Sequence, residues 1–212
     1  MYLSRLNLNT DLRTSRELRI NPYLLHQAVF RAFPDASNGG AGRVLYRMDI
    51  NRQGKMVLLV QSEKAPNWTN AEIISSCLSE SAEFKNYAPS FRPGQQLNYL
   101  LRANPTVKKA KPEQPGITKR QGLLREEDQL KWFVRKAENG GFSIVSCRPI
   151  PEGIVQDERG KKESGKLRHY GVCFEGVLSV TDPEAFEVTL QNGIGAAKGF
   201  GFGLLSIAPL KD

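Results

Sequence analysis

Alternation of apolar and polar residues at several places along the chain predicts strands, and a 3.6-residue apolar period elsewhere predicts helices. In the first half, strands are predicted at residues 3–9, 43–50, 56–61 and 96–102. Helices are predicted at 21–33, where Asn21 caps the first turn and Pro22 takes the first helical position, and at 70–78. Read in order, these elements are β-α-β-β-α-β, a ferredoxin-like arrangement.

The second half repeats this theme less regularly. A helix is predicted at 126–138, strands at 142–147, 171–180 and 204–208, and a capped helix that begins near Pro183. The two halves share no sequence identity, so the duplication rests on element order. We therefore expect an α+β protein with two tandem ferredoxin-like (βαββαβ, RRM-like) domains, at residues 1–92 and 93–212.

Composition narrows the class of protein. Hydrophobic residues make up 40% of the 212 residues and charged residues 25%, as in ordinary globular proteins. No apolar run approaches the ~18 residues that span a bilayer, and the N-terminus lacks the plan of a secretion signal. Three scattered cysteines without a CxxC pair favour reduced thiols. We expect a cytoplasmic protein with no membrane partner.

The net charge of +8 is concentrated in two segments. From Arg102 to Arg125, seven basic residues face only one acidic residue, Glu113. The second segment, 156–168, is a predicted hairpin or loop in which acidic residues offset part of the charge. Each segment is either a solvated loop or a contact for a polyanion such as RNA. The candidate contacts are Arg102, Lys108, Lys109, Lys111, Arg159, Lys161, Lys162, Lys166 and Arg168.

Few residues are available for catalysis. His26 and His169 are the only histidines, and two histidines alone do not make a credible catalytic metal site. The chain has no HExxH, Walker or GxSxG motif, and its carboxylates are scattered. We expect neither a metal nor a cofactor, and His169 is left out of the predicted site.

The helix at 21–33 is the best candidate for a catalytic element. Tyr23, Gln27 and Arg31 recur every four residues on a polar face, and His26 lies one turn after Tyr23. Imidazole titrates near neutrality and can accept or donate a proton. The alternative is that His26 only forms hydrogen bonds at a helix surface. The buried stripe of this helix is predicted to be Leu25, Ala28, Val29, Ala32 and Phe33.

Five glycines fall between Gly193 and Gly203, which indicates a sharply turning backbone. A dinucleotide fingerprint is excluded, because such a loop follows a strand and opens a helix. Residues 198–202 copy the start of the RNP1 pattern, but RNP1 lies on an internal strand and too few residues follow here. The match is interpreted as accidental. A contact between this loop and an RNA backbone stays open, through Lys198, Gly199 and Gly201.

Six segments spread along the chain resemble the CasE family, the repeat-RNA endoribonucleases of type I-E CRISPR systems. The segments are residues 1–4, 23–27, 101–105, 164–166 and 174–178, and a C-terminal one that runs from 193–195 to 204–210. The resemblance implies two ferredoxin-like domains and metal-independent cutting at the 3′ base of the repeat stem-loop. It implies as partners the CRISPR repeat RNA and other Cascade subunits, without direct reading of DNA.

By matching position, the resemblance implies that His26 is the principal catalytic residue, that Tyr23 assists it, and that Lys166 contacts the phosphate. The ribose 2′-OH would attack the neighbouring phosphate, giving a 2′,3′-cyclic phosphate and a 5′-OH. Two alternatives stay open. One is a non-catalytic subunit that binds an RNA hairpin through the same basic surfaces, and the other is a nucleotide-binding enzyme that uses the glycine loop.

Overall fold

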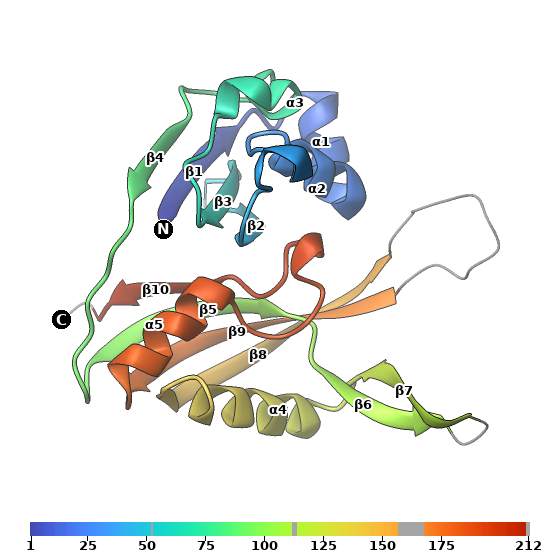
Figure 1. Ribbon diagram of the computed structural model, residues 1–212, viewed down its shortest axis with the longest axis vertical. Coiled ribbons are helices and arrows are strands. Elements are labelled where there is room, and N and C mark those ends of the chain that lie inside the picture. Colours follow the sequence, from blue (N-terminus) through green and yellow to red (C-terminus); the bar gives the residue numbers. More distant parts are fainter. Residues whose placement is uncertain (52, 112–113, 157–167, 211–212) are drawn as a thin grey trace.

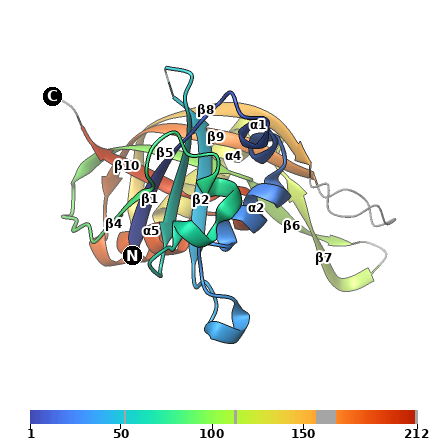
Figure 2. The ribbon, with the colours of Figure 1, turned by 90° about the horizontal axis from the view of Figure 1, so that it is seen from above.

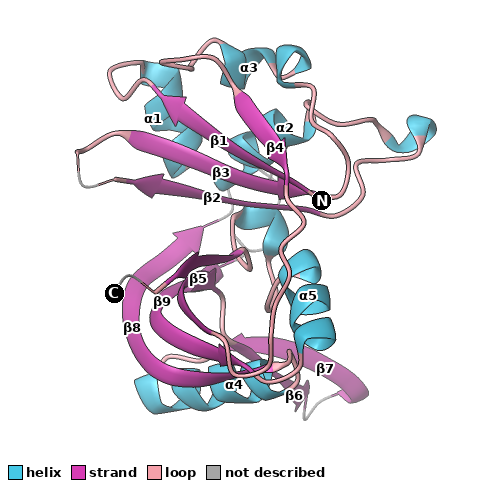
Figure 3. Cartoon of the chain, turned by 90° about the vertical axis from the view of Figure 1, so that its left-hand side faces the viewer, coloured by secondary structure: helices cyan, strands magenta, loops and turns pink. Residues whose placement is uncertain are grey.

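The computed structural model describes residues 1–51, 53–111, 114–156 and 168–210. Two four-stranded antiparallel sheets form two units that are stacked on one another, with α3 at one end of the molecule and α4 at the other (Figures 1 and 3). A separate two-stranded ribbon extends from the second unit (Figure 1). Within the described ranges, no helix is both long and apolar enough to cross a bilayer.

The first unit has a sheet of order β2-β3-β1-β4, which is the ferredoxin-like order. Helices α1, α2 and α3 cover one face of it. The elements are β1 (Tyr2–Leu8), α1 (Arg13–Ile20), α2 (Pro22–Phe30), η1 (Ala36–Asn38), β2 (Val44–Ile50), β3 (Met56–Ser62), η2 (Trp68–Asn70), α3 (Glu72–Ser75) and β4 (Glu83–Asn86).

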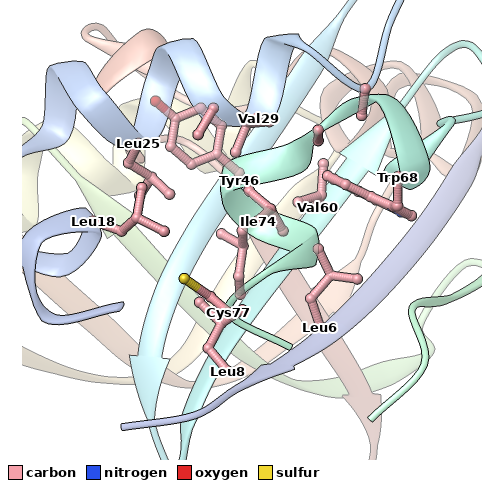
Figure 4. Close-up of a cluster of buried hydrophobic side chains, with 14 of the residues drawn as sticks. Leu6, Leu8, Leu18, Leu25, Val29, Tyr46, Val60, Trp68, Ile74 and Cys77 are labelled. Atoms are coloured by element: carbon pink, nitrogen blue, oxygen red, sulfur yellow. The ribbon is translucent and has the colours of Figure 1, made fainter. Parts of the chain in front are cut away.

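Helix α2 begins where the sequence predicts. The Asn21 side chain accepts hydrogen bonds from the backbone N–H groups of Tyr23 and Leu24, both at 3.1 Å, and so caps the helix. The predicted apolar stripe is buried throughout, and Leu25 and Val29 pack in one cluster with Tyr46 of β2 (Figure 4). This packing fixes the orientation of α2, and with it the direction in which His26 points.

The second unit has the order β10-β5-β9-β8, which is the same spatial plan as the first. The predicted α+β fold with two ferredoxin-like units is therefore confirmed. The elements are β5 (Gln96–Ala103), β6 (Thr106–Lys111), β7 (Gln114–Gly122), α4 (Glu126–Glu138), β8 (Phe142–Gln156), β9 (Arg168–Val180), α5 (Pro183–Asn192), η3 (Lys198–Phe200) and β10 (Leu205–Pro209).

The structure corrects the assignment of one strand. The strand predicted at 96–102 as the last element of the first unit is β5, which pairs with β9 and β10 in the second sheet. The strand that closes the first sheet is β4, whose four residues are all exposed and therefore show no alternation. The predicted boundary between residues 92 and 93 falls between β4 and β5 and stays a prediction.

Two further elements escaped prediction. Helix α1 has no side-chain N-cap, and residues 13–20 carry four charged side chains that hide its short apolar face. The basic segment at 102–125, for which a solvated loop was one of the two alternatives, contains the β6–β7 hairpin.

The two units are joined by hydrogen bonds from β2 and β3. Arg47, only 4% exposed, donates from Nη1 to the Ser206 hydroxyl at 3.0 Å, while its Nε binds the Asp49 carboxylate at 2.8 Å. The Gln61 amide donates to the Leu190 carbonyl oxygen at 2.7 Å in a buried position. Because buried polar groups need partners, these bonds hold the units in one arrangement.

Candidate active site

His26 lies in the middle of α2 and is half-buried. Its ring centroid is 4.3 Å from that of Phe30 and 6.5 Å from that of Tyr46. The imidazole thus rests on an aromatic floor without being enclosed in the hydrophobic core. What lies across from it is the 3-10 turn η3 of the glycine-rich segment, which contacts α2.

Gly199 is the residue of η3 that lies against His26. A Cβ at Gly199 would be 3.5 Å from both Cε1 and Nδ1 of His26. The Gly199 carbonyl oxygen accepts a hydrogen bond of 2.5 Å from the Tyr46 hydroxyl. The second unit therefore supplies one wall of the His26 site, and a residue of the first unit holds that wall in place.

The phenol of Tyr46 is suited to this task. The side chain is fully buried, and burial raises its pKa well above the usual value, although the nearby Arg102 guanidinium opposes the shift. The hydroxyl therefore stays protonated at neutral pH and remains a hydrogen-bond donor to the Gly199 carbonyl oxygen.

The backbone conformation after η3 explains why glycine is needed at two positions there. Gly201 has φ +78° and Gly203 has φ +90°, a region in which L side chains are strained. A Cβ at Gly203 would also lie 2.9 Å from the Ile194 carbonyl oxygen. The segment follows α5 and precedes β10, so it is neither the strand of an RNP1 motif nor a dinucleotide loop. The segment therefore lacks the strand–loop–helix context on which a nucleotide-binding role for it would depend.

Tyr23 lies on α2 with His26, as the spacing predicted, whereas the helix predicted to continue to residue 33 ends at Phe30 and Arg31 is its C-cap residue. The Tyr23 hydroxyl accepts a hydrogen bond of 3.0 Å from the Gln27 amide, and Arg31 is exposed one turn further on. The phenol is thus on the same helix as the imidazole, and the Arg31 cation lies just beyond the end of that helix.

Arg102 and Lys198 are more enclosed than free phosphate contacts would be. The Arg102 Nε is 2.5 Å from Glu152 Oε2, and its guanidinium lies 4.5 Å from the ring centroid of Phe202. Burial lowers the pKa of Lys198, and the nearby cations Arg43 and Lys136 add to the effect. Arg102 lies against the glycine-rich segment and Lys198 belongs to it, and contact of either residue with RNA stays a prediction.

The β6–β7 hairpin carries like charges opposite one another. Lys108 pairs with Arg120 and Lys109 with Lys119, and all four side chains are exposed. Like charges directly opposite destabilise a two-stranded pair. A polyanion would relieve this repulsion, so the ladder favours a nucleic-acid contact over a passive loop. Lys111 ends β6.

The second basic segment is only partly described. Strands β8 and β9 pair as far as Gln156 and Arg168, and Arg168 is exposed. Four predicted contact residues lie outside the described residues: Arg159, Lys161, Lys162 and Lys166.

Sequence reasoning missed Tyr46 and set His169 aside. His169 Nδ1 is 3.1 Å from the Asn104 amide nitrogen, and its ring centroid is 4.7 Å from that of Phe200 in η3. The glycine-rich segment thus packs between the two histidines. Tyr46 falls within the strand predicted at 43–50, but no local pattern indicated that its hydroxyl reaches a residue 153 positions away.

Comparison with known proteins gives end-to-end matches. The model of the CRISPR associated protein family matches residues 1–209. The CRISPR-associated endoribonuclease Cse3 of Thermus thermophilus is 35% identical, and the Cascade subunit CasE of Escherichia coli is 32% identical. Each alignment covers 99% of this chain and 100% of the relative. The solved structure of Thermus thermophilus Cse3 bound to an RNA representing a pre-cleavage complex matches with a TM-score of 0.80, 30% identity and 98% of both chains.

Proposed function

This chain belongs to the CRISPR-associated protein family, and we propose that it is an endoribonuclease that cuts CRISPR precursor RNA at the 3′ base of the repeat stem-loop. Membership confirms the family resemblance predicted from the sequence. The observation that carries the proposal is the position of His26, partly exposed on α2 and backed by the glycine-rich segment. We further propose that the protein acts in the cytoplasm, retains the cut guide RNA and serves as a Cascade subunit.

The proposed reaction uses a nucleophile that belongs to the RNA. The ribose 2′-oxygen bonds to the adjacent phosphorus and loses its proton, while the bond from phosphorus to the 5′-oxygen breaks and that oxygen gains a proton. The products are a 2′,3′-cyclic phosphate and a 5′-OH. His26 can take the first proton or give the second, and no metal ion is required in either role.

The other residues position the substrate and balance its charge. Tyr23 orients the nucleophile or donates to a phosphate oxygen, and Lys166 offsets charge on the phosphorane. The paired cations of β6–β7, together with the basic residues around 159–168, hold the phosphates of the stem. The glycine-rich segment contributes by packing against the His26 imidazole at Gly199, which restricts the position of the ring.

The decisive experiment compares two synthetic repeat hairpins, one all-RNA and one with a single 2′-deoxy substitution at the cut site. We expect the all-RNA hairpin to be cut in the presence of chelator and the deoxy hairpin to remain intact, and end-group analysis to find the cyclic phosphate. Tight binding of an all-RNA hairpin that stays uncut, with or without added divalent metal, would establish the second candidate, a non-catalytic RNA-binding subunit. The cationic ladder on β6–β7 is compatible with that candidate, so the cleavage result decides.

A further inference from the structure

A cleft of about 680 Å³ opens beside His26 and is not used by the proposed chemistry. It lies between the C-terminal half of α2 and the loop at residues 34–42. His26 forms one edge of it, so a group bound in the cleft would sit next to the reacting phosphate. The lining includes His26, Phe30, Arg31, Asp35, Asn38 and Asn70.

The lining suits a flat, hydrogen-bonding group. Phe30 is partly exposed and Phe33 packs against it at 6.5 Å between centroids, which makes an aromatic wall. The exposed amide of Asn70 stands at the rim and Arg31 adds a cation, while the Asn38 amide nitrogen donates to the Asp35 carboxylate at 2.9 Å and leaves its oxygen as an acceptor. Aromatic rings and side-chain amides are the groups with which proteins stack and read unpaired bases.

Asp35 argues against a phosphate within this cleft. Its carboxylate accepts hydrogen bonds from the Ser37 hydroxyl at 2.7 Å and from the Asn38 backbone N–H at 3.0 Å. These bonds hold the pKa of Asp35 below its usual value, so the group is negatively charged near neutrality. A second phosphate would be repelled there, whereas an uncharged base would not.

The two ends of α2 face different parts of the molecule. At the N-terminal end, Pro22 shares a separate cavity of about 470 Å³ with Ile154 and Val155, next to the end of β8. His26 lies between this region and the cleft. A stem held by the C-terminal hairpins and cut at its 3′ base would therefore send its continuing strand towards the cleft.

We infer that this cleft binds the base of the first unpaired nucleotide on the 3′ side of the scissile phosphate. The inference rests on the proposed function, because it assumes a cut at the 3′ base of the stem. Binding this base fixes the leaving 5′-oxygen relative to His26 and favours in-line geometry. The contact is lost with the departing fragment, so it accelerates cutting without strengthening retention of the guide.

The test uses hairpins with an abasic site at that nucleotide and, as a matched control, an abasic site three nucleotides further on. We expect the first to be cut about tenfold more slowly at saturating protein, in line with the loss of one stacked base, and the second to be cut normally. The affinity of the protein for the cleaved stem-loop should be the same whichever of the three hairpins was cut. Equal rates for the two abasic hairpins and intact RNA would overturn the inference while leaving the nuclease proposal standing. Failure to cut intact RNA would instead remove the nuclease proposal.

A variant locates the effect. N70A should slow the cutting of intact RNA several-fold and have no effect on the hairpin that lacks the base, because both changes remove the same contact. R16A, an exposed change on α1 outside the cleft, is the control and should behave as wild type. If N70A weakens binding of the cleaved product as much as it slows cutting, the cleft holds the retained strand and the inference is wrong.

Discussion

The two units share one strand order but differ in what extends beyond the sheet. In the first unit the predicted site residues Tyr23 and His26 lie on a helix packed against the core, with Arg31 at its C-cap. In the second unit, β6–β7 and β8–β9 run out as long hairpins with many cations (Figure 2). Under the proposed function, one topology would serve acid–base chemistry in one copy and binding of charge in the other. The contact from Tyr46 to Gly199 is where the two roles meet.

Substitution of His26 is expected to have the largest effect, and it separates catalysis from RNA binding most directly. H26A should lower the single-turnover cleavage rate by about 10²–10⁴-fold, which is the scale of one acid–base group. RNA affinity, measured by filter binding, should change little. If H26A lowered RNA affinity as much as it lowered the cleavage rate, His26 would be a recognition residue. The proposed division of catalysis and binding between the two units would then be wrong.

Substitution of Gly199 tests whether the second unit shapes the catalytic helix. An alanine Cβ would meet His26 at 3.5 Å, which is ordinary van der Waals contact, so G199A should keep a rate within about threefold of wild type. G199L would displace the imidazole, and a displacement of about 1 Å can cost roughly 10²-fold. Similar rates for both variants would show that the glycine-rich segment does not constrain His26.

The cationic ladder should affect binding alone. In the K108A/K109A double variant, the slope of log K against log salt should become shallower by about 2, with roughly tenfold weaker binding at moderate salt. Cleavage at saturating RNA should be unchanged. An unaltered salt slope would mean that this hairpin does not contact phosphates, and that the repulsion between its strands serves another purpose.

Removing one oxygen atom from Tyr46 should have a smaller effect. Y46F leaves the Gly199 carbonyl without its donor, which costs about 1 kcal/mol of unfolding free energy and lowers Tm by about 2–4 °C. Cleavage should slow several-fold because the backing of His26 loosens, whereas binding should hold. Y99F, which removes a hydroxyl bonded to the Ser146 carbonyl oxygen far from the site, is the control and should destabilise the fold without slowing cleavage.

The smallest effect is on the pH dependence of stability. The folded pKa of Tyr46 is raised above the unfolded value near 10, so its contribution is complete below pH 10 and is lost as the pH rises above that value. Denaturant unfolding should therefore show a shallower alkaline loss in Y46F than in wild type. Parallel curves for the two proteins would indicate that the phenol is not desolvated in solution.

Local patterns predicted those parts of the structure whose causes are local. The cap of α2, its buried stripe and the spacing of Tyr23 and His26 follow from neighbouring residues, and all are present in the fold. The strand predicted at 96–102 shows the limit: element order made it the last strand of the first βαββαβ repeat, although the predicted boundary at 92/93 places it in the second domain, because alternation identifies a strand without naming its partner. Tyr46 and His169 could not be placed for the same reason, since each acts across more than 60 residues of sequence.

Two adjacent residues of β2 connect the first unit to the second. The Tyr46 hydroxyl donates to the glycine-rich segment. The Arg47 guanidinium donates to residues of β5 and β10. A single strand thus both joins the two units and supports the wall of the proposed His26 site. If the proposed site is correct, neither unit produced alone should cut RNA. Two separately expressed fragments would regain activity only on reassembly, which makes this strand a natural place to engineer an inducible, split form of the protein.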